Sequence, residues 1–407
     1  MTLAVRSLAV LHVSSARSAA ANCTRLLHGQ KRSFHATTAR SHISYLVAGS
    51  CSAKGSRFNA DKHTYVFNPA SQDAIGVVLD DTHLSPVNRR YGRPGSGEDA
   101  FFASRVGGNS GAIAFAIADG VGGWAEHKVD PADVSHGLCT YMAQHALSVD
   151  MAAQDVLLRP KELLQKGYDA VLADEVIKAG GTTASVGIAQ ANGNVELANL
   201  GDSGSALFRL GAVHQYSTPQ THAFNTPFQL NVIPPQMRQQ AHMFGGMYFE
   251  DQPRDAAVST ACMQDGDVLV LATDGVFDNL NNQEILKIVT GRMVHGGAWK
   301  ETPEGGISVT GKLQAMADVS SLPTPPASPA PSSSSSSSAM SKTGSHHTLP
   351  GLVASSIVHE AKRASHDIRR DGPFAREAQR YFPGHWYRGG KVDDICVLVI
   401  VAVGEHV

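Results

Sequence analysis

Short apolar runs flanked by glycine-containing turns recur along the chain and constrain its fold more than any other feature. They are rich in β-branched residues or alanine, and their length is typical of strands rather than of helices. Because each run is almost wholly apolar, they predict strands that are buried in a core. The runs cover residues 112–118, 184–189, 195–200, 205–210, 268–273 and 395–401.

Segments with helical spacing of apolar residues lie between these runs. Pro131 falls in the first turn of the first segment, and Gly180-Gly181 follow the second as a stop signal. Asn281 or Asn282 is placed to cap the third. The segments predict helices at about 130–147, 160–178, 281–289 and 352–369. Helices and strands are therefore expected to form separate layers.

The composition excludes several classes of protein. The chain has 407 residues, of which 42% are hydrophobic and 17% charged, as expected for one large globular domain with irregular additions. A formal net charge of −2 argues against nucleic-acid binding, which needs a strongly basic balance. Five scattered cysteines argue against a disulfide framework or a zinc site. No apolar stretch approaches the roughly 18 residues of a membrane-spanning helix, so we expect a soluble protein.

The first 41 residues have the composition of a mitochondrial transit peptide. They are rich in serine, alanine and arginine, and the first acidic residue of the chain is Asp61. Arg6 and Arg17 interrupt the apolar core that a secretory signal would need. Residues 32–41 resemble a two-step processing site, with a mature chain that begins near Ser41. We expect a disordered transit peptide at 1–41 and a mitochondrial location, with the matrix favoured over the intermembrane space; the alternative is a disordered basic tail.

A segment at about 319–348 is predicted to be disordered. It combines proline with seven consecutive serines, Ser332 to Ser338, and lacks the apolar residues needed to form a core. The apolar run at 395–401 follows this segment and needs partner strands. We therefore expect an insertion within one domain of residues 42–407 rather than a linker between two domains.

Acidic residues beside glycine stand at the boundaries of the predicted strands. Asp119 directly follows one buried run, and Asp274 lies at the end of another. A single Asp-Gly pair is more often a simple turn, but the repetition would gather several carboxylates whose mutual repulsion bound cations would relieve. Oxygen ligands without paired histidine or cysteine favour Mg²⁺ or Mn²⁺ over zinc. The clusters cover residues 97–100, 118–124, 273–278 and 389–394.

From about residue 96 to residue 401 the chain resembles the protein phosphatase 2C family of metal-dependent serine/threonine phosphatases. The resemblance lies in the strings Asp119-Gly-Val-Gly-Gly-Trp124, Gly180-Gly-Thr-Thr-Ala-Ser185, Ala198-Asn-Leu-Gly-Asp-Ser-Gly204, Leu271-Ala-Thr-Asp-Gly-Val-Phe-Asp-Asn279 and Gly390-Lys-Val-Asp-Asp-Ile395. The first of these strings, together with residues 222–230, resembles the mitochondrial branch of the family. The implied fold is α+β, an α-β-β-α sandwich of two antiparallel sheets flanked by helices.

The resemblance also implies a site that holds two Mg²⁺ or Mn²⁺ ions. Asp119 would bridge both ions, while Asp274 and Asp393 would complete one of them. Asp99 would orient a water molecule, and Asp202 matches a position linked to a weaker third ion. The catalytic residues would be Asp99, Asp119, Asp274 and Asp393, and the metal ligands Glu98, Asp119, Gly120, Asp202, Asp274 and Asp393. The implied activity is hydrolysis of phosphoserine and phosphothreonine on mitochondrial phosphoproteins by water activated between two metal ions.

The sequence departs from the family pattern at two positions. The arginine that grips phosphate in many members is matched only by Arg93, at a shifted spacing. Val121 replaces a histidine proposed as general acid, and His127 fits a surface loop better than that role. The sequence is compatible with two roles for His222, packing and contact with substrate. These departures motivate a rival hypothesis, a noncatalytic phosphoprotein-binding scaffold with the same fold; hydrolysis of small phosphoesters is a third.

Overall fold

The computed structural model describes residues 42–80, 84–108, 111–149, 157–246, 248–317, 347–384 and 387–405. The predicted transit peptide, 1–41, lies outside the described residues. So does the predicted insertion, except for its last two residues.

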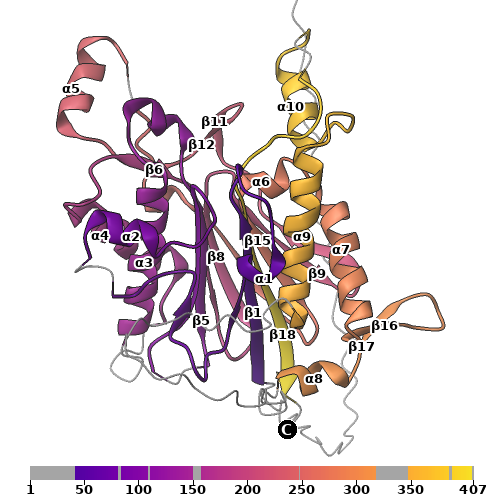
Figure 1. Ribbon diagram of the computed structural model, residues 1–407. Helices are drawn as coiled ribbons and strands as arrows, with labels where there is room; N and C mark the ends of the chain where they lie inside the picture. The colour runs from indigo at the N-terminus through magenta and orange to yellow at the C-terminus, as the bar shows by residue number, and fades with distance from the viewer. Residues whose placement is uncertain are drawn as a thin grey trace, which may run out of the picture. The chain divides into compact units, whose positions relative to one another are not determined.

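Two six-stranded antiparallel sheets form the centre of the protein (Figure 1). The first has the order β10 (Ala212–Tyr216), β9 (Gly204–Arg209), β15 (Val268–Ala272), β18 (Ile395–Glu405), β1 (His42–Ser52) and β2 (Thr64–Phe67). The second has the order β14 (Ala257–Cys262), β8 (Asn194–Leu200), β7 (Ala184–Ala189), β5 (Ile113–Asp119), β4 (Asp99–Arg105) and β3 (Ala74–Ile75). Short antiparallel pairs are β6 (Gly180–Thr182) with β13 (Leu230–Val232), β11 (Thr221–Ala223) with β12 (Thr226–Pro227), and β16 (Trp299–Glu301) with β17 (Ile307–Val309).

Two pairs of helices cover the outer faces of the sheets (Figure 1). The helices α3 (Ala132–Ser148) and α4 (Pro160–Ala173) pack on the second sheet, and α7 (Asn282–His295) and α9 (Leu349–Ser365) pack on the first. The predicted α-β-β-α sandwich is thus confirmed. The shorter helices are α1 (Ala60–His63), α2 (Pro86–Tyr91), η1 (Gly122–His127), α5 (Pro235–Met243), η2 (Pro253–Asp255), α6 (Asp274–Phe277), α8 (Lys312–Ala317) and α10 (Pro373–Tyr381).

The strand β18 shows why the apolar runs are continuous rather than alternating. Successive side chains of a strand point to opposite faces of its sheet. Ile395, Val397, Val399 and Val401 belong to the core under α7 and α9, whereas Cys396, Leu398, Ile400 and Ala402 belong to the core between the two sheets. Both faces of the strand are covered, so both sets are apolar. The strand lies between β1 and β15, which both precede the predicted insertion.

The observed elements agree with most of the predicted strands and differ at some helix ends. The second predicted helix ends at Ala173 rather than near residue 178. There the carboxylate of Asp174 accepts a hydrogen bond from the backbone N–H of Val176 at 2.8 Å and pairs with Arg89 at 2.6 Å. The fourth helix begins at Leu349, three residues before its predicted start, because the hydroxyl of Thr348 caps it. The predicted cap Asn281 is confirmed.

Candidate active site

The predicted carboxylates stand at the ends of four central strands. Asp99 is the first residue of β4 and pairs in register with Asp119, the last residue of β5. Asp274 follows β15 after one intervening residue, and Asp393 precedes β18 by two residues. Since β4 and β5 are neighbours in one sheet, and β15 and β18 in the other, the two pairs come from opposite layers. Here "the acidic cluster" means Glu98, Asp99, Asp119, Asp202, Asp274, Asp278, Asp393 and Asp394.

A buried threonine joins the two layers at this point. The hydroxyl of Thr273 donates a hydrogen bond to Oδ2 of Asp99 at 2.8 Å and accepts one from the backbone N–H of Cys396 at 3.0 Å. Thr273 and Asp99 are both buried. The side chain of Thr273 therefore fixes the start of β4 against the end of β15 and the start of β18. It also holds one oxygen of Asp99 in place.

Glycine is required after Asp274 by a close backbone contact. The predicted Asp-Gly turn is here the start of the short helix α6, and the φ of Gly275 is not positive. A Cβ atom on Gly275 would lie 1.9 Å from the carbonyl oxygen of Asp394. At Gly120, a Cβ atom would lie 2.8 Å from the carbonyl oxygen of Glu98. The two Asp-Gly pairs thus bring backbone segments of the site into direct contact.

We expect the substitution Gly275→Ala to displace Asp394 and to lower the free energy of unfolding by about 3 kcal/mol, because the backbone must move to admit the methyl group. Gly123→Ala is the matched control, since a Cβ atom at Gly123 meets nothing within 4 Å. Urea denaturation of both variants measures the difference. Equal stability of the two would show that the close contact with Asp394 has no energetic weight.

Lys391 lies among three carboxylates of the acidic cluster. Its Nζ atom is 2.5 Å from Asp274 Oδ2, 2.6 Å from Asp278 Oδ2 and 3.1 Å from Asp393 Oδ2, and its side chain is only 16% exposed. The side chain of buried Asn279 accepts from the backbone N–H of Lys391 at 3.0 Å and donates to its carbonyl oxygen at 2.8 Å. Both backbone groups of the lysine are therefore held, and its ammonium group is fixed between the carboxylates.

Burial and mutual repulsion perturb the acids of the cluster. Burial is the largest cause, and repulsion from Asp274 the second, of a pKa for Asp119 well above its ordinary value. The same two causes raise the pKa of Asp202 to about 7. Burial also raises the pKa of Asp99, with Asp394 as its strongest charged neighbour. For Asp274, burial acts upward, but the charge and hydrogen bond of Lys391 outweigh it, so its pKa is lowered. The site thus holds more negative charge than its one buried lysine compensates.

The chemistry of these residues fits hard divalent cations. Among the described residues, no group of three or more acidic, histidine or cysteine side chains has the spacing of a formed metal site. The ammonium group of Lys391, however, shows that three of the carboxylates accommodate a cation between them. Oδ1 of buried Asp99 has no hydrogen-bond partner in the described part of the chain. A donor set made only of oxygen, with excess negative charge, suits Mg²⁺ or Mn²⁺.

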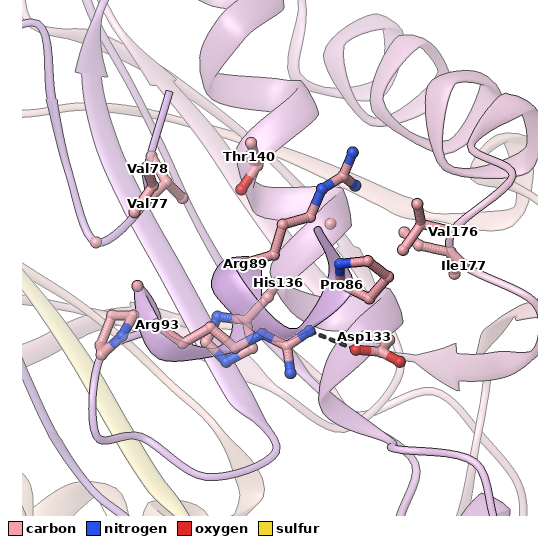
Figure 2. A pocket seen from close by; sticks show the side chains of 14 residues that line it. Val77, Val78, Pro86, Arg89, Arg93, Asp133, His136, Thr140, Val176 and Ile177 are labelled. Carbon is pink, nitrogen blue, oxygen red and sulfur yellow. Dashed lines mark hydrogen bonds and ion pairs between the residues drawn. The ribbon is translucent and has the colours of Figure 1, made fainter. Parts of the chain in front are cut away.

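Arg93 is paired with two acids that do not belong to the acidic cluster. Its guanidinium group donates to Asp130 Oδ2 at 3.2 Å and to Asp133 Oδ1 at 2.5 Å, and its side chain is 16% exposed. Figure 2 shows Arg93 and Asp133 pointing toward each other in a small pocket beside α2 and α3, and none of the predicted site residues lines that pocket. The arginine at the shifted spacing is thus used to fix α3 against the segment before β4.

The other side chains considered for the site pack elsewhere. The ring of His222 stacks between Phe228 and Phe249, with centroids 4.3 Å from each, and hydrogen bonds with Asp251 at 2.9 Å. These contacts agree with the packing alternative for His222. His127 is exposed and touches the ring of Trp124. The buried thiol of Cys396 lies in the core between the sheets, and the described cysteines are free.

The sequence pattern gave no specific role to Lys391, Thr273, Asp278 or Asp394. All four lie inside the strings that resemble the family, so the sequence indicates that they are close to the site. The sequence does not indicate which residues they contact, because partners such as Lys391 and Asp274 are 117 residues apart in the chain.

Comparisons with known proteins agree with this arrangement. A family model described as protein phosphatase 2C matches residues 90–298. The chain is 33% identical over 268 residues to "Protein phosphatase 2C homolog 7, mitochondrial" of Saccharomyces cerevisiae, covering 65% of this chain and 75% of that protein. It is 34% identical over 314 residues to "Protein phosphatase PTC7 homolog" of Xenopus laevis, covering 76% and 82%. Among solved structures, the photosystem II phosphatase PBCP matches with a TM-score of 0.50 and 25% identity, covering 78% and 96%.

The chain therefore belongs to the protein phosphatase 2C family, and it is a protein serine/threonine phosphatase. The family expected from the sequence is confirmed, and the name of the yeast relative agrees with the expected mitochondrial branch. In the described part of the chain, no helix combines the length and apolar character needed to cross a membrane.

Proposed function

We propose that this phosphatase is metal-dependent and hydrolyses phosphoserine and phosphothreonine with a water molecule activated between two Mg²⁺ or Mn²⁺ ions. The observation that carries the proposal is the meeting of carboxylates from both sheets: Asp99 and Asp119 from one, Asp274 and Asp393 from the other. Such a concentration of buried negative charge is costly unless cations compensate it.

Each residue of the proposed site has a distinct task. Asp119, Asp274 and Asp393 would hold the two ions, and the carbonyl group of Gly120 would add an oxygen ligand. Glu98 would bind through coordinated water. The chemistry that two bound ions supply is Lewis-acid activation of water and neutralisation of phosphoryl charge. Asp202 is the proposed ligand of a weaker third ion.

Asp99 would orient the attacking water. Thr273 already holds its Oδ2 atom, which leaves Oδ1, buried and without a partner among the described residues, to accept a hydrogen bond from water. Val121 cannot donate a proton, so the leaving alkoxide would take its proton from water. This reaction would need no side-chain nucleophile, because the water that Asp99 orients would attack phosphorus directly.

Removal and restoration of the metal test the proposal. We expect phosphate release from a phosphoserine peptide to stop after chelation and to return when Mn²⁺ or Mg²⁺ is added. A small phosphoester serves as the comparison substrate and should be turned over less efficiently. Full activity in the chelated protein would contradict the metal-dependent mechanism, and peptide binding without turnover at saturating Mn²⁺ would favour the scaffold alternative.

We also propose that the protein acts on mitochondrial phosphoproteins, in the matrix rather than the intermembrane space. The support is the basic, acid-free composition of residues 1–41 and the mitochondrial name of the yeast relative. Residues 42–407 would remain as the phosphatase domain. A reporter fused to residues 1–41 should enter mitochondria and be shortened near residue 41; a full-length reporter outside the organelle would contradict this.

A further inference from the structure

We propose that Lys54 binds the phosphoryl group of the substrate, in the role that Arg93 does not fill. This inference rests on the proposed function, because it assigns the substrate's charge to the edge of the same acidic cluster.

Lys54 is tied to the acidic cluster through a shared carboxylate. The backbone N–H of Lys54 donates to Oδ1 of Asp394 at 2.5 Å, and the backbone N–H of Glu98 donates to Oδ2 of the same residue at 2.7 Å. The Nζ atom of Lys54 lies 3.7 Å from Oδ1 of Asp393. The ammonium group therefore stands beside a proposed metal ligand, and its backbone is fixed next to another.

The loop that carries Lys54 is held from two further sides. Lys362, on α9, donates from Nζ to the carbonyl oxygens of Ala53 at 2.8 Å and of Lys54 at 2.9 Å. The backbone N–H of Ala53 donates to the carbonyl oxygen of Gly95, three residues before Glu98, at 3.2 Å. These contacts prevent the backbone at Lys54 from moving away from the site, as a substrate-positioning residue requires.

The side chain of Lys54 is freer than those of Lys391 and Arg93. It is 54% exposed and, among the described residues, forms one ion pair, which is 3.7 Å long. Lys391 and Arg93 are each 16% exposed, and they form three and two shorter ion pairs respectively. Lys391 and Arg93 would have to give up these ion pairs to reach a ligand. Lys54 can turn toward an incoming anion from a fixed backbone without breaking a short contact.

A phosphate ester also needs such a cation. It carries up to two negative charges, and it must approach a cluster of acids. Carboxylates of the cluster whose charge the metal ions do not neutralise would repel it. A flexible ammonium group at the edge of the cluster offers a point charge for phosphoryl oxygens, which is the usual way in which lysine binds phosphate.

The test compares Lys54→Met with Lys54→Arg and with the control Lys62→Met, which removes an exposed lysine of α1. With Mn²⁺ saturating, we expect Lys54→Met to lower kcat/KM for a phosphopeptide by about 10- to 100-fold, mainly through KM. Lys54→Arg should keep most of the activity, and Lys62→Met all of it. Thermal unfolding of Lys54→Met should match that of the wild type, because the side chain is exposed.

Binding of inorganic phosphate, measured by calorimetry on the Mn²⁺-loaded proteins, separates this inference from the proposed function because it needs no turnover. We expect the Kd of phosphate to rise at least tenfold in Lys54→Met. If the wild type binds phosphate through Lys54 but shows no metal-dependent turnover, the proposed function fails and the assignment of Lys54 stands. If kcat/KM and the Kd of phosphate both stay within twofold of the wild type in Lys54→Met, the assignment is wrong.

Discussion

Asp119→Asn and Asp274→Asn are each expected to reduce the turnover of a phosphoserine peptide by on the order of 10³-fold or more, which corresponds to about 4 kcal/mol of transition-state stabilisation. Each substitution keeps the shape of the side chain but removes the charge that would hold a divalent ion. Initial rates at saturating Mn²⁺ measure the effect. Asp169→Asn, at an exposed position of α4, is the control and should retain full activity.

The stability of the Asp119→Asn variant separates loss of a ligand from misfolding. Burial, followed by repulsion from Asp274, raises the pKa of Asp119 in the folded protein, so its ionised form opposes folding at neutral pH. Neutral asparagine should therefore leave the metal-free protein at least as stable as the wild type. An inactive variant that melts well below the wild type would mean that the lost activity reflects unfolding, and an active one would contradict the role of Asp119.

Lys391→Met is expected to lower the free energy of unfolding of the metal-free protein by about 3 kcal/mol, because it leaves three half-buried carboxylates without their common cation. The same substitution should increase the stabilisation gained on adding Mn²⁺, since the ions would no longer compete with an ammonium group for Asp274 and Asp393. Urea denaturation with a chelator and with Mn²⁺ measures both quantities.

Lys287→Met, at an exposed position of α7, is the matched control for Lys391→Met and should change neither quantity. If Lys391→Met were as stable as this control without metal, the ion pairs of Lys391 would contribute nothing to the fold. An unchanged increment on adding Mn²⁺ would show that lysine and metal do not compete.

The central strands could be predicted from the sequence, whereas the outer ones could not. The run at 395–401 is apolar on both faces because β18 is covered by helices on one side and by the second sheet on the other. The edge strand β14 was missed because its residues are largely exposed and polar residues interrupt it. Helix ends depend on single side chains such as Asp174, whose partner Arg89 is 85 residues away in the chain. Such partners cannot be identified from local pattern.

The positions of the acids were predictable, but their interactions were not. Asp119 and Asp274 were found because each lies where a strongly apolar run ends. Lys391 carries no local sign of its role, since a lysine near a glycine pair is typical of an exposed loop. It meets Asp274 only because β15 and β18 are paired in a particular register. The contact between Thr273 and Asp99 likewise requires the two sheets to be stacked.

Anomalous diffraction from a crystal soaked in Mn²⁺ tests most directly whether carboxylates from both sheets hold a pair of ions. We predict two adjacent manganese peaks, one beside Asp119, Asp274 and Asp393 and the other beside Asp119 and the carbonyl oxygen of Gly120. An absence of manganese at this position, with the three carboxylates turned away from one another, would contradict the account.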